Sequence, residues 1–444
     1  MEKFTEILNI ANDIYLNPEL GYKEKRTSNI VKNYILRYMP DANISEFSET
    51  GLKVNIGERK NIHIGLIAEL DGVFAPSHFH ADKATGAAHN CGHYSQVAIL
   101  LSLFRTLVET EIYKTFDFSL GFIFIPAEEY LDLEYRKNLR EDGKITYFGG
   151  KPEAMKLGVF DEFDLCIAIH SMGGVFEKRS IEINCDLAGF MYKNFTFKGK
   201  ASHAGFAPQV GINAYSISTL FNVALGLLRQ QVDERYMPRM NPVILESNMG
   251  VNVIPNRIKI GSDIRANSTD YMLELSQRLN MIGKGSALSL GGDVEIESSL
   301  GYLPFNQSRY LSTFVKSAFE KFDRIEFCKD SSPVSASGDI GDLSFMIPTI
   351  QIGYSGFKGT IHGDDFIHDD VEYIFSIANW LPIAVNIIFN SAKVDLNALL
   401  LTPSIIILKV ILINIASTTP ILMLLPVNGL NISMINSGII GKKA

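Results

Sequence analysis

The stretch His89-Asn90-Cys91-Gly92-His93 organises this chain, and an apolar, helix-like run follows it over residues 97–107. Cys91 and His93 stand two positions apart, where we expect a loop to enter a helix. A thiolate sulfur and an imidazole nitrogen are both good ligands for first-row metals. Alone, the two residues are equally typical of a buried cysteine and a structural histidine, so a metal site needs further ligands elsewhere.

Four short apolar runs are typical of buried strands, and polar side chains follow each of them. Alternation of such strands with helical stretches predicts an α/β domain with a largely parallel sheet. Functional groups in these sheets gather beyond the carboxyl ends of the strands. Carboxylate or imidazole side chains follow all four strands. A shared metal site explains this better than four unrelated polar residues at the surface. The pairs are residues 62–68 with Asp71, 118–125 with Glu128 and Glu129, 164–169 with His170, and 347–352 with His362.

A different pattern lies between these blocks. It predicts the order β-α-β-β-α-β, which is the ferredoxin-like arrangement. We therefore expect a discontinuous α/β domain of residues 1–187 and 304–394, interrupted by an inserted α+β domain over residues 188–303. The expected elements are strand 190–200, helix 212–231, strands 242–250 and 257–265, helix 271–284 and strand 293–297.

Composition narrows the functional class. The 444 residues carry a formal net charge of −8, and no basic cluster suggests a nucleic-acid surface. The four cysteines are scattered without paired spacing, so we do not expect a disulfide framework. The N-terminus lacks the basic-then-apolar layout of a signal peptide, so we expect a cytoplasmic protein.

The last stretch, residues 395–444, differs in composition from the rest. Residues 404–426 are rich in isoleucine and leucine, and Lys409 is their only charged residue. The run is long enough to span a membrane, but Asn414 and Pro420 interrupt it. Two interpretations stay open: a tail anchor, or a C-terminus foreign to the protein.

The residues that end the strands, together with the opening stretch, supply more ligands than one structural metal site uses, since such a site is closed by four. Five ligands suit two metals that share a bridge and keep positions open for water and substrate. Two-metal hydrolases use their ions to generate hydroxide and to polarise a carbonyl. The candidate ligands are Cys91, His93, Glu129, His170 and His362.

The paired glutamates and the nearby aspartate take separate roles in this hypothesis. We assign Glu129 to a metal and Glu128 to the general base, because neighbouring residues past a strand end can point differently. Asp71 is expected to orient a ligand imidazole.

Each residue also has a purely structural interpretation. Two glutamates at a strand end are usually a solvated pair, His170 alone suits a satisfied core histidine, and His362 suits a turn. We interpret His78 and His80 as surface residues. The hypothesis of a metal site depends on the co-occurrence of the candidates rather than on any one of them.

Several stretches together resemble the amidohydrolase branch of the co-catalytic metallopeptidases, over roughly residues 5 to 392. This branch includes N-acyl-amino-acid amidohydrolases, hippurate hydrolases, aminobenzoyl-glutamate hydrolases and carboxypeptidase G-type enzymes. The resemblance is closest to the aminobenzoyl-glutamate type, on the Thr85-Gly86 arm and the Gly341-Asp342 segment. The matching stretches, in the family's order, are residues 90–93, 126–129, 169–170, 199–204, 252–255, 263–265, 337–342 and 362–363.

The resemblance implies a di-metal aminopeptidase-like catalytic domain with the same five ligands and Glu128 as general base. It makes residues 188–303 a lid and dimerisation domain. His203 from the lid would stabilise the oxyanion, within one chain or across the dimer, and Asn252 and Arg265 would contact the substrate's carboxylate. One departure is Tyr94, where many relatives have aspartate.

These observations predict an amidohydrolase with two divalent metal ions, zinc or manganese, with cobalt or nickel as further options. Its substrate would be an N-acyl or N-aroyl amino acid, aminobenzoyl-glutamate-like, or a small dipeptide. Two alternatives stay open: a dipeptidase or carboxypeptidase of the same superfamily, and a non-catalytic protein that binds a carboxylated ligand on the same fold.

Overall fold

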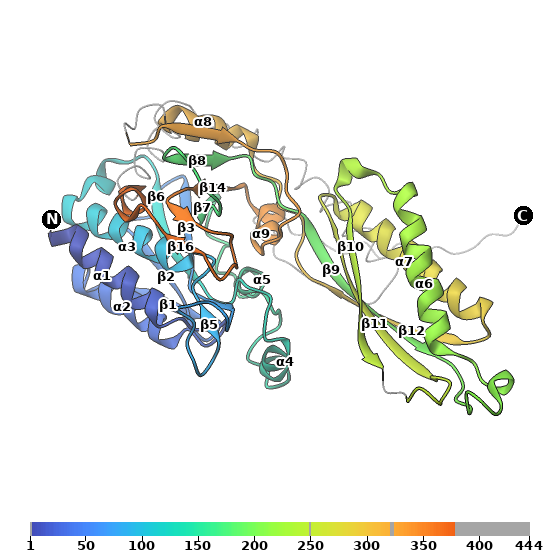
Figure 1. Cartoon of the computed structure of the whole chain (residues 1–444). Helices are drawn as coiled ribbons and strands as arrows, with labels where there is room; N and C mark the ends of the chain where they lie inside the picture. The colour runs from blue at the N-terminus through green and yellow to red at the C-terminus, as the bar shows by residue number, and fades with distance from the viewer. Residues whose placement is uncertain (1, 248–249, 320–323, 378–444) are drawn as a thin grey trace, which may run out of the picture.

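The computed structural model describes residues 2–247, 250–319 and 324–377. They form two main sheets, each with its own helices, which lie beside one another in the molecule (Figure 1). The larger sheet has eight strands in the order β1-β2-β6-β3-β7-β14-β8-β13, and the smaller has four in the order β10-β11-β9-β12. The mixed α/β fold with a large central sheet, predicted from the strand pattern, is therefore confirmed.

The middle of the larger sheet is parallel. Strand β3 pairs in parallel with both β6 and β7, and β7 pairs in parallel with β14. Every residue of β3 and β6 is buried, as expected of strands covered on both faces. These central strands are β3 (His63–Glu69), β6 (Ser119–Ile125), β7 (Leu165–Ser171) and β14 (Thr349–Tyr354).

The outer strands of this sheet run differently. On one side β2 is antiparallel to β6, and β1 is antiparallel to β2. On the other side β8 is antiparallel to β14 and parallel to β13. Their bounds are β1 (Ile44–Phe47), β2 (Gly51–Ile56), β8 (Ser180–Ile183) and β13 (Phe327–Asp330). Two short hairpins accompany the sheet: β4 (Val73–Phe74) with β5 (Ala87–Ala88), and β15 (Phe357–Lys358) with β16 (Ile367–His368).

Helices cover both faces of the larger sheet. Leu66 of β3 packs in the core that α1, α2 and α3 share, whereas its neighbour Ile67 packs with Ala154 of α5 and Leu343 of α9. This alternation follows from the two-residue period of a strand. The helices of this part are α1 (Glu2–Leu16), α2 (Lys25–Tyr38), α3 (His93–Thr110), α4 (Leu133–Glu141), α5 (Gly150–Lys156), α8 (Arg309–Phe319) and α9 (Ile340–Met346).

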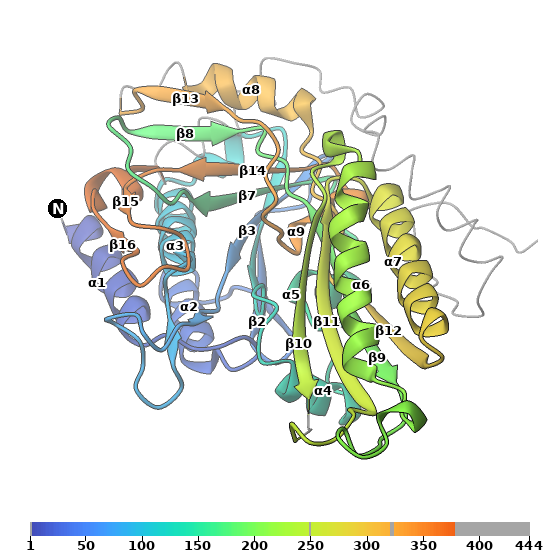
Figure 2. The same ribbon diagram turned by 45° about the vertical axis from the view of Figure 1, so that its right-hand side comes forward.

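The smaller sheet is antiparallel throughout and carries α6 and α7 on one face (Figure 2). Phe195, Phe197 and Phe221 form part of the core between them. The chain order is β9-α6-β10-β11-α7-β12, the order expected from the sequence. The bounds are β9 (Gly189–Lys198), α6 (Ala214–Leu228), β10 (Arg239–Ser247), β11 (Arg257–Ala266), α7 (Thr269–Ser289) and β12 (Asp293–Leu300).

Two further sequence expectations meet the structure here. His78 is buried rather than at the surface, because its ring bonds to the backbone oxygen of Phe366 at 3.1 Å; His80 is exposed. The apolar tail, residues 395–444, lies outside the described residues. Among the helices that the structure describes, none is both long and apolar enough to cross a membrane.

Candidate metal centre

The predicted ligands meet at the carboxyl ends of the parallel strands. Glu69 is the last residue of β3, Glu128 and Glu129 follow β6, and His170 is the last but one residue of β7. His362 comes from the loop between β15 and β16. The geometry of a parallel sheet therefore brings together side chains that lie far apart in the sequence.

Cys91 and His93 reach the same place through the start of α3. Gly92 caps this helix with a φ of 86°, a left-handed conformation that L side chains rarely adopt. A Cβ on Gly92 would also lie 2.6 Å from Oγ of Ser171. That hydroxyl donates to the backbone oxygen of Cys91, at 2.6 Å, and ties the start of the helix to the end of β7. The glycine thus lets the two ligands flank a sharp turn at the sheet edge.

The ligand atoms form two trios that share one sulfur. Cys91, His93 and His170 each place a ligand atom within 4.8 Å of the other two, and so do Cys91, Glu129 and His362. Sγ of Cys91 lies 3.6 Å from Nε2 of His170, and Oε1 of Glu129 lies 3.0 Å from Nε2 of His362. All five residues predicted as metal ligands are therefore in one cluster, with Cys91 at its centre.

Hydrogen bonds determine which ring nitrogens face the cluster. Nδ1 of His93 donates to the backbone oxygen of Asp71 at 2.9 Å, and the Asp71 carboxylate is 3.3 Å from the same nitrogen. Nδ1 of His170 donates to the backbone oxygen of Ser171 at 2.9 Å. Both rings therefore keep Nε2 for the cluster, which is the usual arrangement of a metal-binding histidine. Asp71 lies where an orienting residue must lie, and its Oδ2 also accepts from the backbone N–H of Glu129 at 3.0 Å.

The turn that carries the two glutamates is strained and firmly held. Ala127 has a φ of 54°, and its N–H donates to the buried carboxylate of Glu24 at 2.8 Å. The buried guanidinium of Arg136 donates to the backbone oxygens of Glu129 and Phe148. A positive φ in alanine persists only where the surroundings enforce it. These contacts give the glutamates a defined direction.

Electrostatics separates the roles of the two glutamates. Burial, with the charges of Glu69 and Glu129, raises the pKa of Glu128 well above its usual range. Burial would also raise the pKa of Glu129, but the close approach and charge of the His362 imidazole outweigh this and lower it to about 2. Glu129 is thus the ionised ligand of the pair.

The thiol of Cys91 is also prepared for ionisation. Burial opposes ionisation, but the charges of His93 and His170 lower the pKa of the thiol to about 6. Metals bind the thiolate rather than the thiol. Near neutral pH both trios therefore contain an anionic ligand.

Three predicted residues lie apart from this cluster. His203 is exposed, and its Nδ1 accepts from the N–H groups of Gly205 and Phe206. The N–H of Ala204 donates to the backbone oxygen of Asn252, so His203 and Asn252 are neighbours in the smaller-sheet unit. The third of these residues is Arg265. Within the described residues, none of the three has a hydrogen bond or ion pair to the cluster.

Arg265 has local partners instead. It donates to the Asp263 carboxylate at 2.8 Å and to the backbone oxygen of Ser335 at 3.0 Å, and it lies over the ring of Phe190. Because Ser335 precedes α9 of the larger unit, Arg265 lies where the two units meet.

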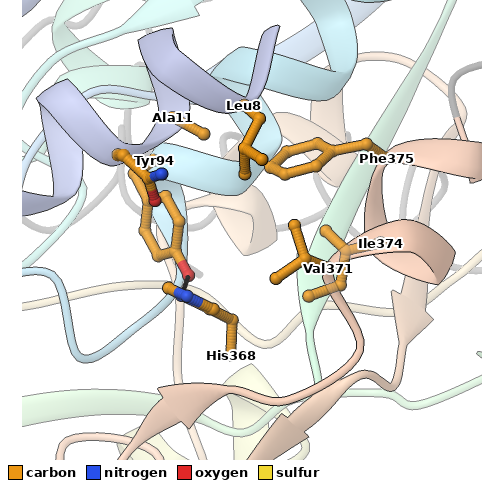
Figure 3. Close-up of a pocket in the computed structure, with 8 residues that line it drawn as sticks. Leu8, Ala11, Tyr94, His368, Val371, Ile374 and Phe375 are labelled. Carbon is orange, nitrogen blue, oxygen red and sulfur yellow. Dashed lines mark hydrogen bonds between the residues drawn. The ribbon is translucent and has the colours of Figure 1, made fainter. Parts of the chain in front are cut away.

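Tyr94, the departure from the resembled family, points to another part of the molecule. Its hydroxyl hydrogen-bonds to Nδ1 of His368 at 2.8 Å, and its ring packs on that of Tyr15 with centroids 4.8 Å apart. Figure 3 shows the Tyr94 ring in a small pocket with Leu8 and Ala11 of α1. The orientation of His93 therefore depends on Asp71 rather than on the residue that follows it.

Sequence reasoning gave no role to Glu69, Lys151 or Asp339, which also belong to this centre. Glu69, His93 and Glu128 form a third trio whose ligand atoms lie within 4.8 Å of one another. Behind Glu69 lies the fully buried Lys151, bonded to both Glu69 and Asp339. The strand-end argument that identified Asp71 applies equally to Glu69. No local signal distinguished Lys151 from a surface lysine.

The donor set fits divalent metals. Nε2 of His93 and Oε1 of Glu129 are buried and make no hydrogen bond, although anionic or imidazole groups lie near both. Buried polar atoms without hydrogen bonds are rare and call for an explanation. Thiolate, imidazole and carboxylate ligands around them supply one.

Comparison with known proteins agrees with this geometry. The model of peptidase family M20/M25/M40 matches residues 65–390. The IAA-amino acid hydrolase ILR1-like 4 of Arabidopsis thaliana is 24% identical over 369 residues, which cover 80% of this chain and 77% of that protein. The N-acetyldiaminopimelate deacetylase of Streptococcus suis is 26% identical over 354 residues, 75% of this chain and 86% of that protein.

Solved structures share the fold. The YXEP protein of Bacillus subtilis, described as a dinuclear metal binding peptidase from the M20 family, superposes with a TM-score of 0.67 at 16% identity, over 88% of this chain and 99% of that one. The aminobenzoyl-glutamate utilization protein of Klebsiella pneumoniae gives a TM-score of 0.61 at 15% identity, over 86% and 95%.

Proposed function

Since this chain belongs to peptidase family M20/M25/M40, whose members are metal-dependent hydrolases of amide bonds, we propose that it cleaves N-acyl or N-aroyl amino acids. An aminobenzoyl-glutamate-like substrate is our first candidate, and a small dipeptide is the second. The observation that carries the proposal is the double trio around Cys91, with Glu128 beside it. The similarity to an IAA-amino acid hydrolase and to an N-acetyldiaminopimelate deacetylase supports the same class.

Two divalent ions would be held by the five ligands, one by each trio, with Cys91 common to both. Bound there, such ions acidify water and polarise a carbonyl. Thiolate and imidazole ligands favour zinc, and manganese, cobalt and nickel are alternatives that a reconstitution series would rank. Asp71 would keep His93 in the tautomer that leaves Nε2 free.

Glu128 would take the proton from the attacking water and return it to the leaving nitrogen. Its Oε2 lies 3.9 Å from Nε2 of His93, so its carboxylate borders the cluster. Its raised pKa brings a carboxylate closer to neutrality, where one group can both accept and donate a proton. The hydroxyl of Tyr302 holds the Glu128 backbone oxygen at 2.7 Å and limits movement of this turn.

The smaller unit, residues 188–303, would act as a lid and dimerisation domain. His203 would donate to the oxyanion after closure or from the partner chain, because donors must point to where negative charge develops. Asn252 beside it, and Arg265 at the junction of the units, would contact the substrate carboxylate. Because His203 is exposed, closure of the smaller unit could bring it to the metal centre of its own chain, or dimerisation could bring it to that of a partner chain.

The edge of the smaller sheet supports a homodimer. Strand β10 is one of the two edge strands, and Val243, Ile244 and Leu245 are about half exposed on it, at 46, 53 and 51%. An edge strand offers unpaired backbone groups, and an apolar one tends to pair with another chain. Helix α6, which lies on one face of the same sheet (Figure 2), exposes Val223 and Leu227.

The deciding experiment is an amine-release assay on a substrate panel. The purified chain would be given N-acetyl and N-benzoyl amino acids, aminobenzoyl-glutamate and simple dipeptides, with added Zn²⁺ or Mn²⁺ and with chelator. We expect chelator-sensitive release from at least one acylated amino acid. Release from dipeptides alone would identify the dipeptidase alternative, and metal binding with no release from any member would favour the carboxylate-binding alternative.

Cellular location is a separate proposal. We propose a cytoplasmic enzyme that acts on small molecules rather than on nucleic acid. Fractionation of the full chain against one that ends near Lys393 tests the tail-anchor interpretation. Recovery of both in the soluble fraction would exclude the anchor.

A further inference from the structure

A buried glutamate at the start of α2 takes no part in the proposed mechanism. The side chain of Glu24 is completely buried. Its Oε1 accepts from the backbone N–H of Ala127 at 2.8 Å, and its Oε2 accepts from the hydroxyl of Thr50 at 2.6 Å. A buried carboxyl group is costly unless its oxygens are hydrogen-bonded. Both oxygens of Glu24 have such a partner, and one partner belongs to the turn that carries Glu128 and Glu129.

The helix that follows does not explain the direction of this side chain. Glu24 lies at the N-cap position of α2, yet its side chain does not cap that helix. A carboxyl group at this position ordinarily accepts from the N–H of the second or third helical residue. Here Glu19 does so, since its carboxylate accepts from the N–H of Arg26 at 3.0 Å and from that of Thr27 at 2.8 Å. The start of α2 is therefore satisfied without the side chain of Glu24.

The contact from Glu24 acts on the most strained residue of the catalytic turn. Ala127 has a φ of 54°, a left-handed conformation that alanine keeps only where its surroundings enforce it. A Cβ on Gly21 would lie 2.8 Å from Cα of Ala127, so the chain just before Glu24 also packs directly on it. Because Ala127 precedes Glu128, its backbone conformation determines the direction in which the side chain of the proposed base leaves the turn.

The metal ligand that follows has supports of its own. The N–H of Glu129 donates to Asp71 at 3.0 Å, and its backbone oxygen accepts from the Arg136 guanidinium and from the N–H of Leu131 at 2.8 Å. These contacts remain when the bond from Glu24 is removed. Loss of Glu24 is therefore expected to affect the base more than the bound ions.

We propose that Glu24 is a positioning residue for the general base. Through the N–H of Ala127 it would hold the left-handed turn that places the Glu128 carboxylate beside the metal centre, 3.9 Å from Nε2 of His93. This inference rests on the proposed function and extends it to the N-terminal stretch of residues 18–24. Glu24 would act through the backbone and would touch neither substrate nor metal.

The test compares Glu24→Met, Glu24→Gln and a control from the same stretch. Methionine keeps the buried volume but offers no oxygen, whereas glutamine keeps an oxygen that can accept from the N–H of Ala127. The control, Glu19→Ala, removes the carboxylate that caps α2 and leaves the catalytic turn untouched. Four quantities would be measured for each protein: kcat, KM, the number of bound Zn²⁺ ions, and the hydrogen exchange of the peptide that contains Ala127.

We expect Glu24→Met to lower kcat about 10–100-fold, because a displaced general base loses much of its contribution. KM should stay close to the natural value, since the base acts in the transition state. Two ions should remain bound, and exchange at Ala127 should become faster. Glu24→Gln should restore most of the turnover, and Glu19→Ala should keep the natural kcat although its melting temperature falls.

A natural kcat in folded Glu24→Met would overturn the inference. An equal loss of kcat in Glu19→Ala would also overturn it, because the stretch would then act through stability alone. If Glu24→Met does not fold, the nearly isosteric Thr50→Val decides, since it removes the bond to the second oxygen of Glu24. We expect a several-fold lower kcat at unchanged KM, and an unchanged kcat would overturn the inference.

Failure of the proposed function would look different. A natural chain that releases amine from no substrate of the panel would refute that function. Hydrogen exchange would still report whether Glu24 holds the turn, and unchanged exchange at Ala127 in Glu24→Met would by itself overturn the inference. The two failures are therefore distinguishable.

Discussion

At the level of single residues, the chemistry of this centre depends on which atom each side chain leaves free. His93 and His170 each bond through Nδ1 to a backbone oxygen and present Nε2 to the cluster. Cys91 and Glu129 have a pKa of about 6 and about 2, so both are anionic at neutral pH. The proposed division of labour leaves Glu128 as the carboxylate that can carry a proton.

Replacement of Glu128 by glutamine tests that division. The amide keeps the size of the side chain but cannot take a proton from water, so we expect turnover to fall by about 10²–10⁴-fold, the usual contribution of a general base. Metal content should stay at the natural value, since Glu129 and the other ligands are intact. Parallel measurement of turnover and bound metal checks this, and full activity would refute the assignment of the base.

Tyr94 gives the opposite expectation. Tyr94→Phe removes one hydrogen bond to His368 but keeps the ring against Tyr15, so the free energy of unfolding should drop by about 1 kcal/mol. Metal affinity should not change, because the hydroxyl has no contact with a ligand residue. Denaturant melts and a zinc titration would check both parts; a lost metal ion would show that Tyr94 supports the centre after all.

Much of the site could be predicted residue by residue, and the omissions have physical reasons. Asp71, Glu128, Glu129 and His170 follow apolar runs, and the polarity of a parallel sheet is enough to gather them. Glu69 was passed over because it closes a fully buried strand. The interpretation of His78 was wrong because its partner, Phe366, lies 288 residues further along the chain.

Among the elements, the junction of the loop with α3 determines the centre most directly. Strand β7 and helix α3 meet through the bond from Ser171 to the backbone oxygen of Cys91. This junction presents Cys91 on one side and His93 on the other. The apolar run that follows, which packs α3 into the main core, fixes the direction of the helix.

Gly92→Ala probes this junction. The new Cβ would lie 2.6 Å from Oγ of Ser171 in a backbone with a φ of 86°. We expect a loss of about 1–3 kcal/mol in the free energy of unfolding, from backbone strain and displacement of β7. Metal affinity should fall as well, since both flanking ligands must move. A variant with natural stability and natural metal binding would contradict this description of the turn.

The elements themselves were predictable to within a few residues, and their arrangement less so. The strand expected over residues 242–250 is β10 (Arg239–Ser247), and the helix expected over residues 271–284 is longer, α7 (Thr269–Ser289). Their pairing into the order β10-β11-β9-β12 depends on contacts between distant segments. Local periodicity carries no information about such contacts.

At the scale of the whole molecule, the two units meet near the centre, and the smaller sheet leaves its β10 edge open. Arg265 bonds to Ser335 across the junction, and Tyr302, just past β12, bonds to the Glu128 turn. A movement of the smaller unit would therefore shift the turn that carries Glu128, the proposed general base. This coupling is what a lid requires.

The open edge leads to a prediction about assembly. Ile244→Asp places a charge on the exposed edge of β10 without touching the core of the smaller sheet. We expect a dimer of the natural chain and a monomer of the variant in light scattering after size exclusion, because a charge on an edge strand opposes pairing. The exposed Lys284→Gln on α7 serves as a control of equal charge change, because it also lowers the net charge by one. A natural chain that is monomeric at every concentration would exclude the dimer.

The most direct test of the account is a count of metal ions per chain in three proteins. Cys91 belongs to both trios and His170 to one, so the natural chain should bind two ions, His170→Ala one, and Cys91→Ala neither, when all are equilibrated with Zn²⁺ and freed of excess. Circular dichroism would establish that each protein is folded. Two ions retained by folded Cys91→Ala, or none bound by the natural chain, would contradict the shared-cysteine centre from which the proposed function is argued.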